Sequence, residues 1–236
     1  MMNNNQLVLL SPEKLLTRPG LKRLEEIREF SLLPSKRIGW NYPLDYLFVD
    51  LAIERLNDEP KRVVDIGCGP GAIHGFIEHK YDIEVLGIDL QRWEVDYVDH
   101  VGNFLDSQFR ESVGLYSNSQ DIVFSASSLE HQTLEDHQAA IEIARSILRP
   151  GGTLVATVAA AKSESYLTKD PWQWNLSQSD LERVYGLPFE NFSFDLTERE
   201  YHRFPILTEG YEERFRTAFP AKLPYLSVGF AWTKPT

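Results

Sequence analysis

Three glycines at alternate positions, Gly67, Gly69 and Gly71, follow directly on a short apolar run in the stretch VVDIGCGPG, which begins at Val63. Because glycine has no Cβ atom, it adopts positive φ without strain and lets a ligand approach the backbone closely. The residues after this turn carry apolar side chains at helical spacing, so the segment is typical of a strand, a glycine turn and a helix. Such a turn presents backbone N–H groups to a nucleotide, and we therefore expect a nucleotide-type ligand here.

An acidic residue ends the next predicted strand. Residues 83–90 read IEVLGIDL, and Asp89 stands at the end of this run. A carboxylate in this position accepts hydrogen bonds from both hydroxyls of a ribose. The glycine turn and the acid that follows it therefore indicate a ligand that contains a nucleoside.

Apolar periodicity predicts the elements that must hold these residues in place. Short apolar or β-branched runs predict seven strands, over residues 63–66, 83–90, 98–101, 121–125, 153–159, 189–196 and 226–232. Apolar residues at helical spacing predict helices over 72–80 and 135–148, and further helices near 179 and over 209–218. Because strands alternate with helices, the predicted fold class is α/β, with a doubly wound, mostly parallel seven-stranded sheet.

The N-terminal part of the chain is expected to be helical. A serine followed by proline marks a helix start at residue 11, and apolar spacing predicts two further helices, over 21–27 and 44–57. We therefore divide the chain into an N-terminal helical extension and lid over residues 1–60 and a ligand-binding domain over residues 61–236.

Two aromatic stretches are expected to be loops. Residues 39–43 carry a tryptophan and a tyrosine, and residues 160–176 carry Tyr166, Trp172 and Trp174. Each stretch either packs against the sheet or forms a lid over the ligand and its reaction partner. The sequence leaves both interpretations open.

The composition excludes several classes of protein. The 236 residues carry a formal net charge of −11, which disfavours a large nucleic-acid contact. Cys68 is the only cysteine, so no intrachain disulfide forms and a cytoplasmic location fits. The N-terminal stretch lacks the basic region of a signal peptide, and no run approaches the roughly 20 apolar residues of a membrane helix. We expect no nucleic-acid and no membrane partner, and no motif specifies an oligomeric state.

Five features in a fixed order carry a family resemblance. An acid lies two residues before the first glycine, the glycine spacing is G-x-G-x-G, and GNF, DIVFSASSLEH and LRPGGTLVATV follow from residues 102, 121 and 148. Over residues 62–159 this set resembles the class I S-adenosylmethionine-dependent methyltransferases of the small-molecule type. The resemblance implies a Rossmann-like methyltransferase fold, S-adenosylmethionine as cofactor, and methyl transfer to a small-molecule acceptor, with a sugar or another small metabolite as the expected acceptor.

The resemblance also implies which residues contact the cofactor. They are Asp65, Gly67, Cys68, Gly69, Asp89, Leu90, Asn103, Phe104 and Ser125. Asp65 and the backbone of the glycine turn would hold the methionine end, whose positive charges suit an acidic site. Asp89 would bind the ribose hydroxyls and Leu90 would pack on the adenine. Cys68 is expected to be chosen for its size rather than for reactivity.

The remaining cofactor contacts lie after the third and fourth strands. Asn103 stands where the family often has aspartate, and its carbonyl can still accept a hydrogen bond from the adenine amino group. Phe104 would offer its backbone N–H to the adenine ring. Ser125 would face the cofactor near the reactive methyl group.

Methyl transfer is an in-line displacement that requires alignment and exclusion of water, and it needs a base only for a hydroxyl or a protonated amine. His131 is the predicted base because its loop points at the methyl group in this family, and Glu130 is the second candidate. His131 bonded only to backbone is the structural alternative. His137 is expected to be solvated. Glu135 and Asp136 lie close to them, but His131 and His137 are not spaced i, i+4 from each other, and we predict no metal site.

Two other functions are weighed against methyl transfer. Asn103 and the short passage after Asp89 are compatible with a non-catalytic module that keeps the fold and binds a partner. A nicotinamide-dependent oxidoreductase would also use a glycine turn. The sequence contains no Tyr-x-x-x-Lys pair that could serve as the acid–base couple of a short-chain dehydrogenase, which disfavours that class.

Overall fold

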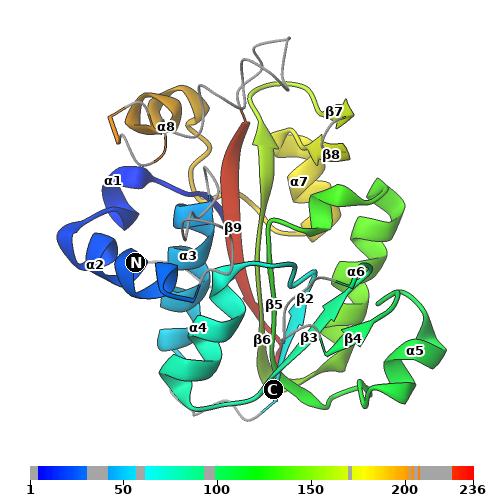
Figure 1. The fold of residues 1–236 in the computed structure, drawn as a ribbon. Coiled ribbons are helices and arrows are strands. Elements are labelled where there is room, and N and C mark those ends of the chain that lie inside the picture. The colour runs from blue at the N-terminus through cyan, green and yellow to red at the C-terminus, as the bar shows by residue number, and fades with distance from the viewer. Residues whose placement is uncertain are drawn as a thin grey trace.

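The computed structural model describes residues 5–30, 42–56, 62–92, 99–169, 172–201, 203–204, 207 and 225–236. These residues include a central seven-stranded sheet with helices on both faces (Figure 1). In spatial order the strands are β1 (Gln6–Leu9), β9 (Tyr225–Thr233), β6 (Leu148–Ala161), β5 (Gln120–Ala126), β2 (Val63–Ile66), β3 (Val85–Asp89) and β4 (His100–Val101). The strands from β6 to β4 run parallel, whereas β9 and β1 pair antiparallel. The predicted α/β class and the mostly parallel seven-stranded sheet are confirmed.

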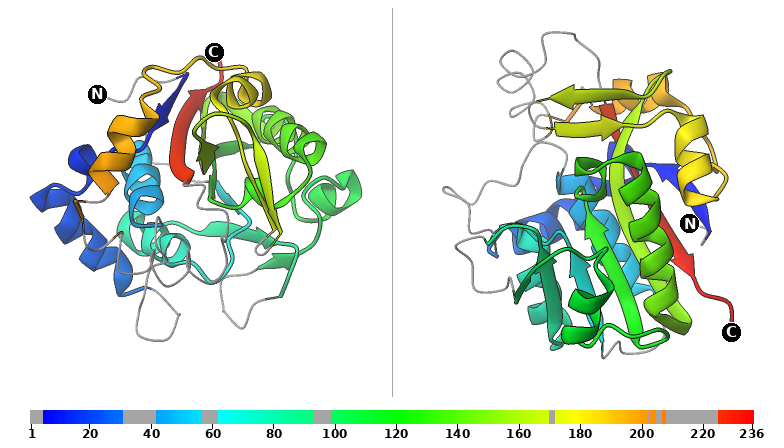
Figure 2. Two further views of the ribbon diagram at one scale, coloured as in Figure 1. Left: turned by 90° about the horizontal axis from the view of Figure 1, so that it is seen from above. Right: turned by 90° about the vertical axis from the view of Figure 1, so that its right-hand side faces the viewer.

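Two groups of helices cover the two faces of the sheet (Figure 2). One face carries α1 (Pro12–Leu15), α2 (Arg18–Arg28), α3 (Tyr42–Glu54), α4 (Ala72–Tyr81) and α8 (Phe194–Tyr201). The other carries α5 (Ser107–Ser112), α6 (Leu134–Ile147) and α7 (Gln178–Tyr185). Each face has its own apolar core. Among the described residues, no helix has the length and apolar character needed to cross a bilayer.

The N-terminal helices share one core with the sheet. Leu24 on α2 and Phe48 on α3 are buried in the same apolar cluster as Phe76 on α4 and the sheet residues Ile122 and Val155. Helix α3 is buried on nearly all sides, which explains why its sequence is almost continuously apolar. The predicted helical character of this region is confirmed for α1 to α3.

The prediction that the N-terminal region contains only helices is wrong at β1. Leu7 pairs with Phe230 of β9, and its N–H donates to the Pro188 carbonyl over 2.9 Å. Phe189 makes a single bridge to Leu7, and the chain then turns into α8 at Phe194, so the strand predicted over 189–196 is also wrong. Both segments are short apolar runs, and periodicity alone does not separate a short strand from a helix start.

Residues 160–176 form a hairpin, which corrects the predicted loop. Strand β6 continues to Ala161, and β7 (Tyr166–Lys169) then pairs antiparallel with β8 (Trp172–Asn175). Aromatic and β-branched side chains favour strands, and here they outweigh the polar character of the stretch. The helix predicted over 209–218 and residues 39–41 of the first aromatic stretch lie outside the described residues.

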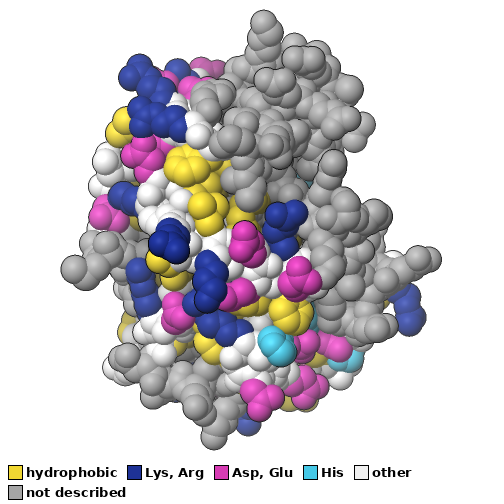
Figure 3. Space-filling view, turned by 60° about the vertical axis from the view of Figure 1, so that its left-hand side comes forward, with side chains coloured by type: hydrophobic (Ala, Val, Ile, Leu, Met, Phe, Trp, Pro, Cys, Tyr) yellow, Lys and Arg dark blue, Asp and Glu magenta, His cyan; other side chains and the backbone are white. Residues whose placement is uncertain are grey.

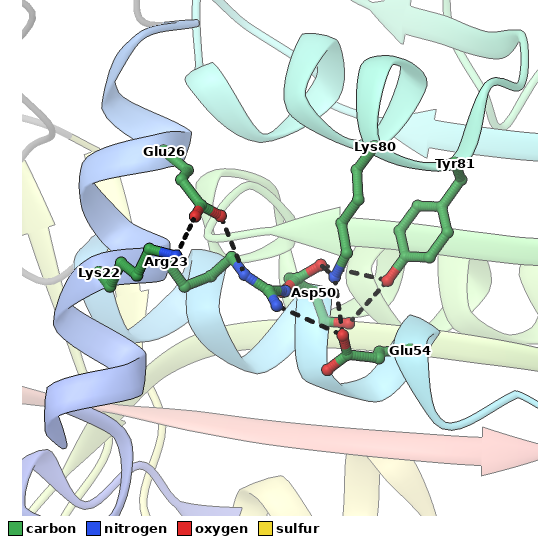
Figure 4. A network of polar contacts seen from close by, with 7 residues as sticks. All are labelled: Lys22, Arg23, Glu26, Asp50, Glu54, Lys80 and Tyr81. Atoms are coloured by element: carbon green, nitrogen blue, oxygen red, sulfur yellow. Dashed lines mark hydrogen bonds and ion pairs between the residues drawn. The ribbon is translucent and has the colours of Figure 1, made fainter.

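Ion pairs tie three helices together on the α2–α4 face (Figure 4). Asp50 of α3 is fully buried and accepts hydrogen bonds from Arg23 of α2 and, over 2.6 Å, from Lys80 of α4. Glu54 binds the same two cations at the more exposed end, at 3.3 and 3.2 Å. Tyr81 donates to an Asp50 oxygen over 3.2 Å. The surrounding surface intersperses basic and acidic side chains rather than separating them into patches (Figure 3).

Candidate active site

Four parallel strands end side by side where the predicted cofactor residues lie. Their order in the sheet is β5, β2, β3 and β4. The chain leaves β2 toward β3 and later returns to β5 on the other side of β2, so the direction of winding reverses between β2 and β5. Ligands of open α/β sheets bind outside the carboxyl ends of the strands at such a reversal. The topology therefore brings Asp65, Asp89 and Ser125 to one edge of the sheet.

The glycine turn after β2 is fixed to the end of β3. Gly67 and Gly69 have φ of +69° and +49°, which L side chains rarely adopt. The N–H groups of Gly67 and Cys68 donate to the Ile88 carbonyl over 2.8 and 3.2 Å. The Gly69 N–H donates to Asp89 Oδ2 over 3.0 Å. The predicted turn is present, and it holds the second acid directly.

The turn is also enclosed from both sides. A Cβ on Gly67 would lie 2.3 Å from Ser128 Oγ, and one on Gly71 would lie 2.7 Å from Tyr46 Oη. The Ser125 and Ser128 hydroxyls each donate to the Ile66 carbonyl over 2.9 Å. Ser125 therefore braces the end of β2 against the loop after β5, a role that the sequence did not predict.

Asp89 and its neighbours keep unused hydrogen-bonding capacity and exposed surface after β3. Asp89 Oδ1 accepts the Gln91 N–H over 2.9 Å, and each carboxylate oxygen keeps a further lone pair for a ribose hydroxyl. Leu90, the next residue, is 67% exposed, so its side chain is available to pack on a flat base. Asn103 is exposed at the end of β4, and its carbonyl accepts the Leu105 N–H over 2.9 Å. Phe104 is buried beside it.

Asp65 is 1% exposed and pairs with a histidine that the sequence analysis left without a role. His74 Nδ1 of α4 lies 3.2 Å from Asp65 Oδ2. Burial raises the pKa of Asp65, His74 offsets part of this shift, and the charge of Asp89 adds to it. Burial alone would lower the pKa of His74, but the hydrogen bond and charge of Asp65 make the net shift upward. The carboxylates of Asp65 and Asp89 therefore lie close enough at this edge of the sheet for the charge of Asp89 to raise the pKa of Asp65.

Cys68 is chemically quiet, as expected. Its side chain is buried, and burial together with the charges of Asp65 and Asp89 raises the pKa of the thiol far above its usual range. Because the thiolate is the nucleophilic form, this cysteine is unreactive at neutral pH.

The predicted base His131 lies on the short helix η2 (Leu129–His131) and contacts the hairpin. Its Nδ1 is 2.7 Å from the Trp172 carbonyl of β8. A carbonyl only accepts hydrogen bonds, so Nδ1 carries a proton and Nε2 holds the lone pair of the neutral ring. His131 is exposed, and this arrangement is compatible with the role of a base and with a purely structural contact.

The sequence analysis named Glu130 as the second candidate base but missed the buried polar cluster to which it belongs. The cluster consists of Asp45 on α3, Ser127 after β5 and Glu130 on η2. Ser127 Oγ donates to Asp45 Oδ2 over 2.8 Å. Burial raises the pKa of Asp45 to about 7, the hydroxyls of Ser127, Ser227 and Thr157 oppose this shift, and the charge of Glu130 adds to it. Burial likewise raises the pKa of Glu130 to about 8, although backbone N–H groups oppose the shift. The sequence signal for this cluster was Asp45 itself, an acidic residue in the first turn of a mostly apolar helix.

These raised pKa values make stability depend on pH. The unfolded carboxyls ionise near pH 4, and the folded ones near pH 7 and 8, so the native state holds more protons between these values and stability falls as pH rises. We expect Glu130→Gln to raise the melting temperature above wild type by at least about 4 °C at pH 8.5 but by much less at pH 5. Differential scanning calorimetry at the two pH values measures this. An equal change in melting temperature at both pH values would contradict the raised pKa of Glu130.

The remaining histidine on this side is buried, which corrects the expectation that it is solvated. His137 Nε2 lies 2.5 Å from the Tyr185 hydroxyl, and burial lowers the pKa of the ring to about 3. The sequence signal for this burial was helical spacing. His137 precedes Ala140, Ile141 and Ala144 by three, four and seven residues, which places it on the same inner face of α6. Within the described part of the chain, no three His, Cys, Asp or Glu side chains are placed to hold a metal ion.

The site fits S-adenosylmethionine. Asp89 offers acceptor oxygens for a ribose, and Leu90 offers an exposed apolar surface for adenine. Asp65 is 1% exposed and bonded to His74, and its contact with the methionine end stays a prediction. The positive-φ glycines let a ligand approach the turn without meeting a Cβ.

Known proteins agree with this assignment. Residues 64–156 match the family model described as "Methyltransferase domain". Cyclopropane-fatty-acyl-phospholipid synthase of Escherichia coli is 25% identical over 189 residues, which cover 70% of this chain and 49% of that protein. The chain spans less than half the length of the first curated relatives that it matches.

Solved structures show the same fold at low identity. The cyclase SpnF is similar with a TM-score of 0.58 at 14% identity, covering 99% of both chains. Phosphoethanolamine N-methyltransferase 2 of Haemonchus contortus, solved with phosphomonomethylethanolamine and S-adenosylhomocysteine, has a TM-score of 0.54 at 17% identity, covering 95% of this chain and 59% of that one. Over residues 64–156 the chain is therefore similar to methyltransferase domains, and its described residues share the fold of these solved structures.

Proposed function

We propose that this chain transfers a methyl group from S-adenosylmethionine to a small-molecule acceptor. The observation that carries the proposal is the placement of Asp89, whose carboxylate joins the glycine turn to the end of β3. Each of its oxygens accepts one backbone N–H and keeps a further lone pair for a ligand. The Haemonchus contortus enzyme was solved with a small molecule and S-adenosylhomocysteine, which supports a small-molecule acceptor. Neither it nor the Escherichia coli relative is named for a sugar, and we do not carry the sugar expectation forward.

The residues of the sheet edge would divide the work as follows. When bound, the cofactor supplies an electrophilic methyl group on a sulfonium. Asp89 and Leu90 would hold the ribose and adenine, and the glycine turn would hold the methionine end. The loop after β5 and the β7–β8 hairpin, joined by the contact between His131 and Trp172, would cover the acceptor side and exclude water. His131 and Glu130 are the two candidate bases for an acceptor that must lose a proton.

Removing the Asp89 carboxylate should weaken cofactor binding. In Asp89→Ala the ribose hydroxyls lose their acceptor, and the Gly69 N–H loses its partner. We expect a loss of about 1–3 kcal/mol in the binding free energy of S-adenosylhomocysteine, measured by isothermal titration calorimetry. Asp106→Ala is a suitable control, because Asp106 only caps α5.

The proposal fails if folded wild-type protein binds no S-adenosylhomocysteine. If the protein binds it but transfers no methyl group to any member of a broad acceptor panel, the non-catalytic module becomes the better interpretation.

A further inference from the structure

Two buried carboxyl oxygens near the glycine turn have no hydrogen-bond partner among the described residues. They are Asp45 Oδ1 and Glu130 Oε2. Asp45 is 0% and Glu130 2% exposed. A buried acceptor without a donor costs free energy, and proteins rarely keep two in one place without a use for them.

Contacts on both sides link this pair to the cofactor site. Tyr46, next to Asp45, puts its hydroxyl against Gly71, and Ser128, next to the Asp45 partner Ser127, lies against Gly67. The first turn of α3 and the loop after β5 therefore flank both the glycine turn and the carboxyl pair. An acceptor bound by the pair would lie beside the cofactor.

The charge of one carboxyl also acts on the other. The charge of Glu130 adds to the upward shift of the Asp45 pKa. Tyr185 of α7 feels the Glu130 charge as well, and Tyr201 of α8 feels that of Asp45. Among the described residues, the groups that shift the pKa of Asp45 or Glu130 include no basic side chain. The pair therefore lacks a compensating positive charge within the described structure, and burial keeps both carboxyls from ionising together at neutral pH.

The number of missing donors selects the ligand chemistry. A hydroxyl acceptor has one O–H and satisfies one oxygen, whereas a primary or secondary ammonium has at least two N–H donors and a positive charge. Such a cation would satisfy both oxygens and let both carboxyls ionise. A phosphate or carboxylate placed here would be repelled.

We propose that Asp45 and Glu130 bind the ammonium group of a primary or secondary amine acceptor and that Glu130 is its catalytic base. This inference rests on the proposed methyl transfer and names its acceptor class. Glu130 takes a proton from the ammonium, and the freed nitrogen lone pair forms the bond to the methyl carbon. The electrons of the carbon–sulfur bond leave with sulfur, which gives neutral S-adenosylhomocysteine, and the positive charge passes to the methylated ammonium. Asp45 holds the second N–H throughout.

A binding experiment tests the amine site without catalysis. Carbon-13 NMR follows the side-chain carboxyl resonances of wild-type protein during titration with methylammonium, with tetramethylammonium and methanol as matched probes. We expect methylammonium alone to shift the Glu130 and Asp45 resonances toward the ionised form. Unchanged resonances, or equal shifts with tetramethylammonium, which has no N–H, would overturn the proposal.

An activity experiment then tests the base. Wild type is expected to methylate members of a panel of primary and secondary amines and not the alcohols of the same skeletons. Glu130→Gln should lower the rate at least ~100-fold, the usual contribution of a general base, with S-adenosylhomocysteine affinity unchanged. Asp45→Asn should raise KM for the amine, and Glu135→Gln, an exposed carboxylate nearby, should change neither.

The failures are distinguishable. Transfer to alcohols alone, to no member of the panel, or at an unchanged rate in Glu130→Gln would overturn the amine assignment while cofactor binding stands. Absence of S-adenosylhomocysteine binding would overturn the proposed methyl transfer and the amine step with it, even if the NMR titration still detected an ammonium site.

Discussion

Gly67→Ala is expected to abolish most cofactor binding while the protein stays folded. The new Cβ would meet Ser128 Oγ at 2.3 Å and Ser128 Cβ at 2.5 Å. Rotating the Ser128 side chain moves only the oxygen, so the loop after β5 would have to shift. That loop is bonded to the Ile66 carbonyl at the start of the turn. Because the whole ligand-facing backbone would move, we expect a loss of about 2–4 kcal/mol in S-adenosylhomocysteine binding, comparable to an overpacked core site with added strain at positive φ.

A matched glycine separates this effect from backbone strain. Gly186 ends α7 with φ of +60°, close to that of Gly67, but a Cβ there would meet no atom within 4 Å. Gly186→Ala should therefore lower stability by about 1 kcal/mol through strain alone and leave ligand affinity unchanged. Calorimetric titration of both variants compares them directly. Equal affinity of Gly67→Ala and wild type would mean that the ligand does not depend on this turn.

Asp50→Ala should produce a large loss of stability although it lies away from the site. Asp50 is buried and holds Arg23 and Lys80, whose side chains are 25% and 20% exposed. Without the carboxylate, two cations would be left at the junction of α2, α3 and α4, where Glu54 binds both and Glu26 binds Arg23 alone (Figure 4). We expect a loss of about 3 kcal/mol in the free energy of unfolding, which is the lower limit of the usual cost of breaking a buried ion pair. The cost is at this limit because Arg23 and Lys80 keep some contact with water.

Glu54→Ala is the control for Asp50→Ala. Glu54 binds the same cations but is 44% exposed, so solvent screens its contribution and we expect a loss of no more than about 1 kcal/mol. Urea unfolding measures the free energy of unfolding of both variants, with one common dependence of this free energy on urea concentration. Similar losses in the two variants would contradict the assigned difference in burial.

The part of the fold that the sequence predicted well is the part built from strong local patterns. The parallel strands β2, β3 and β5 are short runs of apolar residues bounded by glycine or acidic residues, and α6 has a regular apolar face. The glycine turn and Asp89 could be placed because both depend on neighbouring residues in the sequence. Glycine permits positive φ, and the end of an apolar run marks the end of a strand. Such features require no knowledge of which segments meet in space.

The errors arise where tertiary contacts decide. Gln6–Leu9 becomes a strand only because β9 supplies an edge, and Phe189 contributes a bridge to Leu7 instead of a strand. The roles of His74 and Asp45 depend on partners 9 and 82 residues away, Asp65 and Ser127. No periodicity encodes such pairs, so buried polar clusters remain the least predictable part of the site.

A crystal structure grown with saturating S-adenosylhomocysteine tests the central claim most directly. We predict electron density for the nucleoside at the carboxyl edge of β2 and β3, with ribose hydroxyls bonded to Asp89, adenine against Leu90 and the homocysteine end over the Gly67 turn. Well-ordered crystals that show the glycine turn clearly but place the ligand elsewhere, or hold none at saturation, would contradict the account.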